Sequence, residues 1–133
     1  MCVCVCVCVL VLLSSGTPHP RILKVLGVSE ESETQWLVIT ELCPMGHLGN
    51  VLSSDQHRRH MTWKNRKRMA IEAASGMSHM HSPAVGIAHL DLKPQNLLVT
   101  KNYHIAIADF GGARRLEDLK SQQANVIGTP ISV

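Results

Sequence analysis

The residues whose types could act together in one reaction lie between positions 89 and 111. A carboxylate, an ammonium group and an amide fall within six residues there, on Asp91, Lys93 and Asn96, and a second carboxylate follows on Asp109. Carboxylate and amide oxygens are hard ligands that suit Mg²⁺, and a lysine beside them suits phosphate. An Asp near such a site can also accept a proton from a hydroxyl. The combination points to metal-assisted phosphoryl transfer.

Strands and a turn are expected upstream of this stretch. Residues 22–28 and 36–40 are mostly apolar, and the glutamate-rich residues 29–34 between them predict a solvated turn. Two such runs around a polar turn are typical of a β-hairpin. A short helix is expected from His47 to about Ser53.

A long helix is expected to lead into the candidate site. Thr62 occupies an N-cap position, and the helical pattern ends near His81. Apolar residues recur at spacings of three and four, which predicts one buried stripe made of Ala70, Ala73, Ala74, Met77 and Met80. His79 and His81 could bind a metal, but two histidines without a third ligand are usually structural.

Length and composition limit the class of protein. A chain of 133 residues with 45 % apolar and 17 % charged residues fits one globular domain and excludes collagen, coiled coils and multi-pass membrane proteins. The net charge of +3 is too small to argue for a nucleic-acid partner. Six basic residues do cluster at 58–68, and they fit either a phosphate- or nucleic-acid-binding patch or a solvated helix start. With a single aromatic residue, Trp63, among them, the solvated helix start is favoured.

The first 16 residues form a separate low-complexity segment. Cys and Val alternate from Cys2 to Val9, and outside this run the chain has one cysteine, Cys43, as a reducing intracellular compartment allows. A strand would place all four cysteines on one face, where a thiolate metal site could form. A secretory signal is a second interpretation, although the basic n-region is absent. A dipeptide repeat without a chemical role is the third. The apolar stretch is shorter than the ~20 residues that span a membrane.

Two motifs resemble those of protein kinases. They are the catalytic loop, here His89-Leu90-Asp91-Leu92-Lys93-Pro94-Gln95-Asn96, and the DFG motif, here Asp109-Phe110-Gly111. Their order and spacing also fit the family. Four flanking segments look like further kinase landmarks. His19-Pro20-x-Ile22 looks like the turn into the fourth strand, and residues 40–48 look like the gatekeeper, the hinge and the helix start after them. Residues 62–81 look like the helix before the catalytic loop, and Gly128-Thr129-Pro130 looks like the end of the activation segment.

The resemblance implies an α+β fold over residues 17–133. This would be a partial protein-kinase-like fold, with the last N-lobe strands and the first half of the helical C-lobe. No Gly-x-Gly-x-x-Gly sequence occurs, and neither the strand lysine with its helix glutamate nor Ala-Pro-Glu is found. The expected domain is therefore truncated at both ends.

The resemblance also implies a role for each matching residue. Asp91 would be the catalytic base and Lys93 would neutralise charge on the γ-phosphoryl group, while Asn96 and Asp109 would hold Mg²⁺. The nucleotide would be bound by residues of the hinge region and one floor residue: Thr40 at the pocket border, the backbone of Glu41 and Cys43 at the adenine, and Leu98 beneath it. His89 and Phe110 would stack in the spine that couples the lobes.

One position departs from the family pattern. Kinases carry Arg where this chain has Leu90, and Leu cannot bond to a phosphorylated activation loop. Regulation through that Arg is therefore not expected. Leu also occurs here in the Mos family, while residues 73–81 look closer to the tyrosine-kinase-like group, so the subfamily stays open.

The function that the resemblance implies is that of a cytoplasmic serine/threonine protein kinase. Lys93, two places after Asp91, favours Ser/Thr over Tyr. ATP and Mg²⁺ are the expected cofactors, a protein with Ser or Thr hydroxyls the expected partner, and neither nucleic-acid binding nor a membrane span is expected. The alternative is a non-catalytic fragment that binds nucleotide weakly or competes for a kinase's partners. We expect no appreciable phosphotransfer from the isolated chain.

Overall fold

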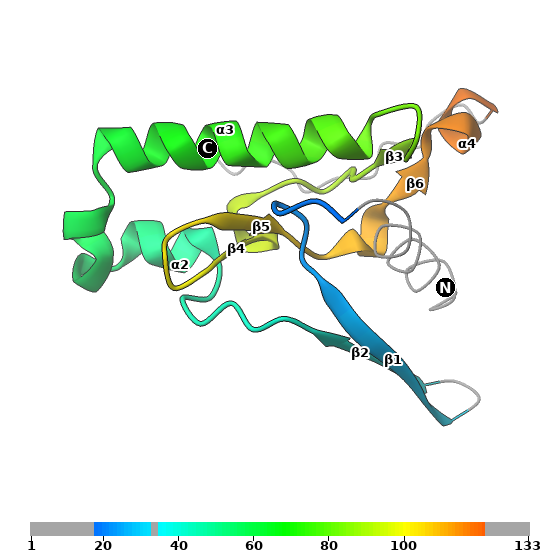
Figure 1. The fold of residues 1–133 in the computed structure, drawn as a ribbon, viewed down its shortest axis with the longest axis horizontal. Helices are drawn as coiled ribbons and strands as arrows, with labels where there is room; N and C mark the ends of the chain where they lie inside the picture. Colours follow the sequence, from blue (N-terminus) through cyan, green and yellow to red (C-terminus); the bar gives the residue numbers. More distant parts are fainter. Residues whose placement is uncertain (1–17, 33–34, 122–133) are drawn as a thin grey trace.

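The computed structural model describes residues 18–32 and 35–121. A long helix, α3 (Trp63–Met80), runs along one side of the described part, and short strands pack beneath it, while a hairpin projects away from the helix (Figure 1). Predictions for residues 1–16, and for the activation-segment end at Gly128-Thr129-Pro130, lie outside the described residues.

The projecting hairpin consists of β1 (Val25–Ser32) and β2 (Gln35–Thr40), which pair antiparallel. The hairpin was therefore predicted correctly, but its bounds were not. β1 continues through residues that were expected to form a turn, because backbone pairing with β2 extends to Ser32. Ile22, expected within this strand, instead forms a parallel bridge to Ile107.

The predicted helices are present. α2 (Leu48–Ser53) begins at the N-cap His47, whose Nδ1 accepts a hydrogen bond from the backbone N–H of Asn50 at 3.2 Å. A 3-10 helix, η1 (Asp55–His60), connects it to α3. Thr62 caps α3 as expected, since its hydroxyl accepts from the Asn65 N–H at 3.3 Å and satisfies one of the free N–H groups of the first turn.

The buried face of α3 differs from the predicted stripe. Ala73 and Met80 are buried, but Ala70 and Ala74 are exposed. The face that packs inward is rotated relative to the prediction and consists of Met69, Glu72, Ala73, Gly76 and Met80. Glu72 and Gly76, which the predicted apolar stripe did not include, therefore lie on the buried face.

Short strand pairs lie below α3 (Figure 1). β4 (Leu97–Val99) pairs antiparallel with β5 (Ile105–Ile107), and β3 (Ile87–Ala88) pairs antiparallel with β6 (Arg114–Arg115). The 3-10 helices η2 (Pro94–Asn96) and η3 (Phe110–Gly112) precede β4 and follow β5, and α4 (Leu116–Ser121) follows β6. The β4–β5 hairpin thus places the residues before β4 and those after β5 at one end of the sheet.

One buried core joins α2, α3 and the small strands. Its largest fully buried side chains are Phe110, Met80, Ile87, Ile105, Ile107, His89, Val51 and Val99. The segment before β1 belongs to it through Ile22, which is only 7 % exposed. Among the described residues, no helix has the length and apolar character needed to cross a membrane.

Candidate functional site

His89 anchors the loop that precedes the candidate site. Its side chain is fully buried, and Nε2 lies 3.0 Å from the carbonyl oxygen of Ala108. Nδ1 accepts a hydrogen bond from the backbone N–H of Asp91 at 3.3 Å. These contacts tie the Asp91 backbone to the chain just before Asp109.

Lys93 and Asn96 both contact the carboxylate of Asp91. Lys93 Nζ lies 2.7 Å from Asp91 Oδ2, and Asn96 Nδ2 donates to the same oxygen at 3.1 Å and to the Asp91 carbonyl at 2.9 Å. Asn96 is buried and Asp91 is half-buried. The structure therefore brings together three of the predicted site residues and fixes the orientation of the carboxylate.

Asp109 lies at the turn after β5. Its backbone is left-handed (φ 59°), and its Oδ1 accepts from the Gly111 N–H at 3.4 Å. Its side chain is exposed, whereas the next residue, Phe110, is buried against His89 with ring centroids 5.3 Å apart. Burial of Phe110 thus directs the chain so that Asp109 faces outward.

Backbone contacts bring the Asp109 turn to the loop formed by residues 89–96. The Ala108 N–H donates to the Asn96 carbonyl at 2.9 Å, just beyond the pairing of Leu97 with Ile107. A Cβ on Gly112 would lie 3.8 Å from the Cβ of Asp91. Residues 89–96 and the turn after β5 are therefore in contact.

Leu90 has an unusual backbone conformation. Its φ is 66°, a left-handed value that a branched side chain rarely adopts without support from its surroundings. It lies between the buried His89 and the bonded Asp91, both of which are fixed by the contacts above. These anchors hold the loop in this conformation.

The residues predicted to contact adenine follow β2. The Glu41 N–H donates to the Lys24 carbonyl at 3.0 Å, and its own carbonyl lies 3.3 Å from the hydroxyl of Thr40. Cys43 is buried, and its carbonyl accepts from Gly46, a turn residue at φ 70°. Burial, and then the negative charge of Glu41, raise the pKa of the Cys43 thiol, which keeps this thiol protonated at neutral pH.

Leu98 is close to this segment because β4 runs beside it. The Val99 N–H donates to Gly46 at 2.8 Å, and Leu98 forms a bridge to His47. A cavity of about 500 Å³ opens next to Glu41 and is lined otherwise by Pro18, His19, Pro20, Ile22, Leu23, Lys24 and Val25. Of the four predicted nucleotide-binding residues, Glu41 alone is among the described residues that line this cavity.

The donor set near the Asp109 turn suits Mg²⁺. Asn96 uses its amide nitrogen on Asp91, which leaves the amide oxygen as the atom able to ligate a cation. The exposed Asp109 supplies carboxylate oxygens, and two hard oxygen ligands leave room for phosphate and water around Mg²⁺. In the described ranges no three His, Cys, Asp or Glu residues are grouped as a metal site by themselves.

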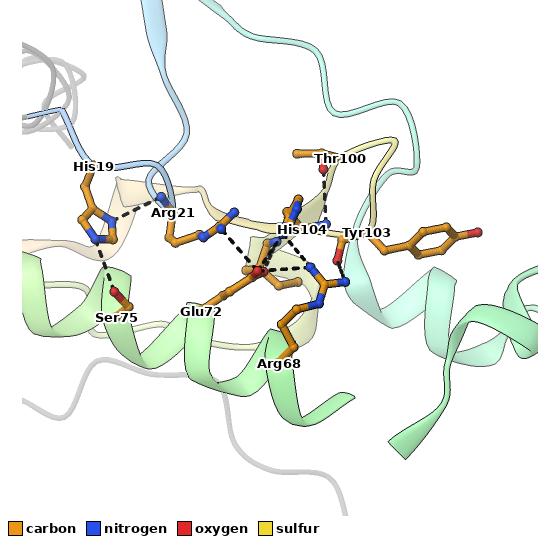
Figure 2. A network of polar contacts seen from close by, with 9 residues as sticks. His19, Arg21, Arg68, Glu72, Ser75, Thr100, Tyr103 and His104 are labelled. Atoms are coloured by element: carbon orange, nitrogen blue, oxygen red, sulfur yellow. Dashed lines mark hydrogen bonds and ion pairs between the residues drawn. The ribbon is translucent and has the colours of Figure 1, made fainter. Parts of the chain in front are cut away.

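The apolar pattern missed one polar residue with a central position. Glu72 is only 7 % exposed on α3, and its carboxylate contacts two arginines, a histidine and a backbone N–H of β5 (Figure 2). Its spacing from Met69, Gly76 and Met80 places it on their face of the helix, and this spacing was the signal available in the sequence.

Comparison with known proteins identifies the family. The model of the protein kinase domain family matches residues 9–131. A probable serine/threonine-protein kinase of Dictyostelium discoideum is 37 % identical over 111 residues, which cover 84 % of this chain and 25 % of that protein. A probable receptor-like protein kinase of Arabidopsis thaliana is 30 % identical over 122 residues, or 84 % of this chain and 35 % of the relative.

A third relative agrees with these two. Wall-associated receptor kinase 2 of Arabidopsis thaliana is 34 % identical over 110 residues, which cover 82 % of this chain and 15 % of that protein. The chain thus spans between 15 % and 35 % of the length of these relatives. Since the family model matches most of the chain and coincides with the site described above, the chain belongs to the protein kinase family.

Proposed function

We propose that residues 89–111 form the phosphoryl-transfer site of a serine/threonine protein kinase, with Mg²⁺-ATP as cosubstrate and a protein hydroxyl as acceptor. The observation that carries this proposal is the convergence of Lys93 and Asn96 on one oxygen of Asp91. The backbone bond from Ala108 to Asn96 supports it, because this bond brings Asp109 to the same end of the β4–β5 hairpin.

Asp91 is the proposed base. Its carboxylate orients the acceptor hydroxyl and takes its proton as the oxygen attacks the γ-phosphorus. A bond forms between the acceptor oxygen and the γ-phosphorus, the bond from the γ-phosphorus to the β,γ-bridging oxygen breaks, and ADP leaves with that electron pair. Lys93, held 2.7 Å from Asp91, offsets negative charge on the transferred group.

Asn96 and Asp109 are the proposed metal ligands. Bound Mg²⁺ supplies charge neutralisation at the phosphates. The contacts of the Asn96 amide with Asp91 orient its free oxygen, and the left-handed turn at Asp109 presents its carboxylate to solvent. For the nucleotide base we propose the backbone of Glu41 and Cys43, with Thr40 at the border and Leu98 as the floor.

The specificity for Ser or Thr rests on two grounds. Lys93 stands two places after Asp91, as in the serine/threonine kinases that the catalytic loop resembles. The Dictyostelium relative, whose match includes most of this chain, is itself named a probable serine/threonine-protein kinase. A second candidate, binding of nucleotide without transfer, is separated from this one by the experiments below.

A thermal melt of the 133-residue chain with and without Mg²⁺-ATP tests the nucleotide site. A ligand in hundredfold excess over its Kd stabilises the folded state by about 2.7 kcal/mol, a rise in Tm on the order of 10 °C. Asp109→Asn should abolish most of the part of the shift that requires Mg²⁺, whereas Asp55→Asn, at a side chain 95 % exposed on η1, should leave it unchanged. A wild-type Tm that does not change when nucleotide is added would contradict the proposal.

Transfer itself is tested with radiolabelled ATP and Ser/Thr peptides. Phosphate incorporation that disappears in Asp91→Asn would support the kinase function. Because no appreciable transfer is expected from the isolated chain, nucleotide binding without incorporation fits both candidates, and incorporation alone distinguishes them.

A further inference from the structure

Glu72 carries a buried carboxylate for which the proposed reaction has no direct use. It lies in the middle of α3, on the face that packs against β5. A buried charge is costly unless partners surround it, so its partners indicate what its position serves. These partners come from three separate segments: Arg21 before β1, Arg68 on α3 itself, and His104 with Ile105 at the start of β5.

The two carboxylate oxygens have different partners. Oε2 accepts a hydrogen bond from the backbone N–H of Ile105 at 3.0 Å. Oε1 lies 2.6 Å from His104 Nδ1, 3.2 Å from Arg68 Nη1 and 3.3 Å from Arg21 Nη2. Oε2 therefore binds the first residue of β5, and Oε1 contacts the side chains of His104, Arg68 and Arg21.

His104 Nδ1 can hydrogen-bond to Glu72 or to Arg68, but not to both at once. His104 Nδ1 lies 2.6 Å from both Glu72 Oε1 and Arg68 Nη1. A proton on Nδ1 donates to the carboxylate, and that nitrogen then cannot accept from Arg68. Arg68 retains its contact with Glu72 and donates to the Tyr103 carbonyl at 3.0 Å. Both side chains thus fix the residues immediately before β5.

Arg21 connects the carboxylate of Glu72 to β5. Its side chain contacts Glu72, while its backbone carbonyl accepts from the Ile107 N–H at 2.9 Å. The Leu23 N–H in turn donates to the Ile107 carbonyl at 2.9 Å. β5 is therefore held at Ile105 by Glu72 and at Ile107 by the segment that Glu72 also holds.

The next turn of α3 lies very close to the same two segments. A Cβ on Gly76 would come within 2.7 Å of Ile107 Cδ1 and 3.0 Å of the Arg21 carbonyl oxygen. This close approach near Ile107 and the bond from Glu72 at Ile105 together set where β5 lies along α3.

We infer that Glu72 is a positioning residue that fixes β5, and with it Asp109, relative to Asn96. β5 ends two residues before Asp109, and the intervening Ala108 donates to the Asn96 carbonyl. Displacement of β5 would change the separation of Asn96 and Asp109. This inference rests on the proposed function, in which those two residues hold Mg²⁺.

Amide hydrogen exchange tests the placement of β5 without any nucleotide. In Glu72→Gln, the amides of Ile107 and Ala108 should exchange about tenfold faster relative to the amides of α3. The NMR chemical shift of the Gly111 amide should also change. The matched control is Ala73→Gly, which weakens the same helix one residue away and removes no contact of the carboxylate. Equal exchange at β5 in the two variants would overturn the inference.

ATP affinity with and without Mg²⁺ tests the consequence for the site. The enhancement by Mg²⁺ should fall about tenfold in folded Glu72→Gln and stay unchanged in folded Ala73→Gly. A purely structural role would lower Tm in both variants and leave the enhancement intact, which would contradict the inference. If the wild-type chain binds no nucleotide, the proposed function fails, and the exchange experiment still decides whether Glu72 holds β5.

Arg21→Met provides a second variant in case Glu72→Gln does not fold. It removes one positive partner of the carboxylate and keeps the bond to Ile105. The same pattern of exchange at smaller amplitude is expected, and a wild-type pattern at β5 would overturn the inference.

Discussion

At the scale of single residues, the buried charge of Glu72 has a direct consequence for acid stability. Burial raises the pKa of its carboxyl group, but the hydrogen bond from Ile105, followed by His104 and the charge of Arg21, outweighs burial and lowers the pKa below its usual 4.5. A carboxyl group whose pKa is lower in the folded state than in the unfolded state stabilises the folded state at pH values above the unfolded-state pKa. This contribution is lost as the pH falls through the folded pKa.

Glu72→Gln should therefore flatten the loss of stability below pH 4.5, since the amide does not titrate. Urea denaturation of wild type and variant across this range measures the effect as the free energy of unfolding. Glu30→Gln, at an exposed position of β1, serves as control and should keep the wild-type slope. A Glu72→Gln slope as steep as that of the wild type would show that other carboxyl groups cause the loss.

The residue scale also shows what side-chain type alone can predict. Asp91 and Asn96 are close in sequence and chemically suited to one another, so their proximity in the loop could be anticipated. Glu72 could not, because a carboxylate on a helix is usually solvated. Its burial depends on Arg21 and Ile105, which are far from it in the chain.

At the scale of elements, the close approach of α3 to β5 depends on the absence of a side chain at Gly76. Gly→Ala inside a helix normally stabilises by about 1 kcal/mol. Here the added methyl group would lie 2.7 Å from Ile107 Cδ1 and 3.0 Å from a backbone oxygen.

We expect Gly76→Ala to destabilise the chain by about 1–3 kcal/mol, opposite in sign to the effect of helix propensity. Thermal melts check the sign. Ser78→Ala, on the exposed face of the same helix, should instead raise stability by a few tenths of a kcal/mol. A stabilised Gly76→Ala would mean that α3 and β5 can separate at little cost.

Local signals predicted the elements better than their partners. The N-cap at Thr62 and the helix start at His47 were predictable because capping depends on neighbouring residues. The end of β1 was not, since pairing across the hairpin extends the strand through Ser32 into polar sequence. The predicted apolar stripe on α3 was misplaced because the buried face of the helix depends on the residues that pack against it, which lie elsewhere in the chain.

At the scale of the whole molecule, the segment before β1 is part of the core. Ile22 is buried and bridges to Ile107, while Leu26, four residues later, is 58 % exposed. Ile22→Ala should therefore cost about 2–5 kcal/mol of unfolding free energy, and Leu26→Ala less than about 0.5 kcal/mol. Urea denaturation measures both; similar small losses would show that the segment contributes little to the fold.

The pairing of residues 21–23 with Ile107 also governs the order in which the chain can fold. These partners lie almost at opposite ends of the described part, whereas the β1–β2 hairpin and α3 form from neighbouring residues. Contacts between distant segments require the costly closure of a long loop, so they form late. During synthesis residues 21–23 emerge before β5 and must wait for it. β5, the strand that leads to Asp109, should therefore gain this neighbour only after all the residues between 23 and 107 have left the ribosome.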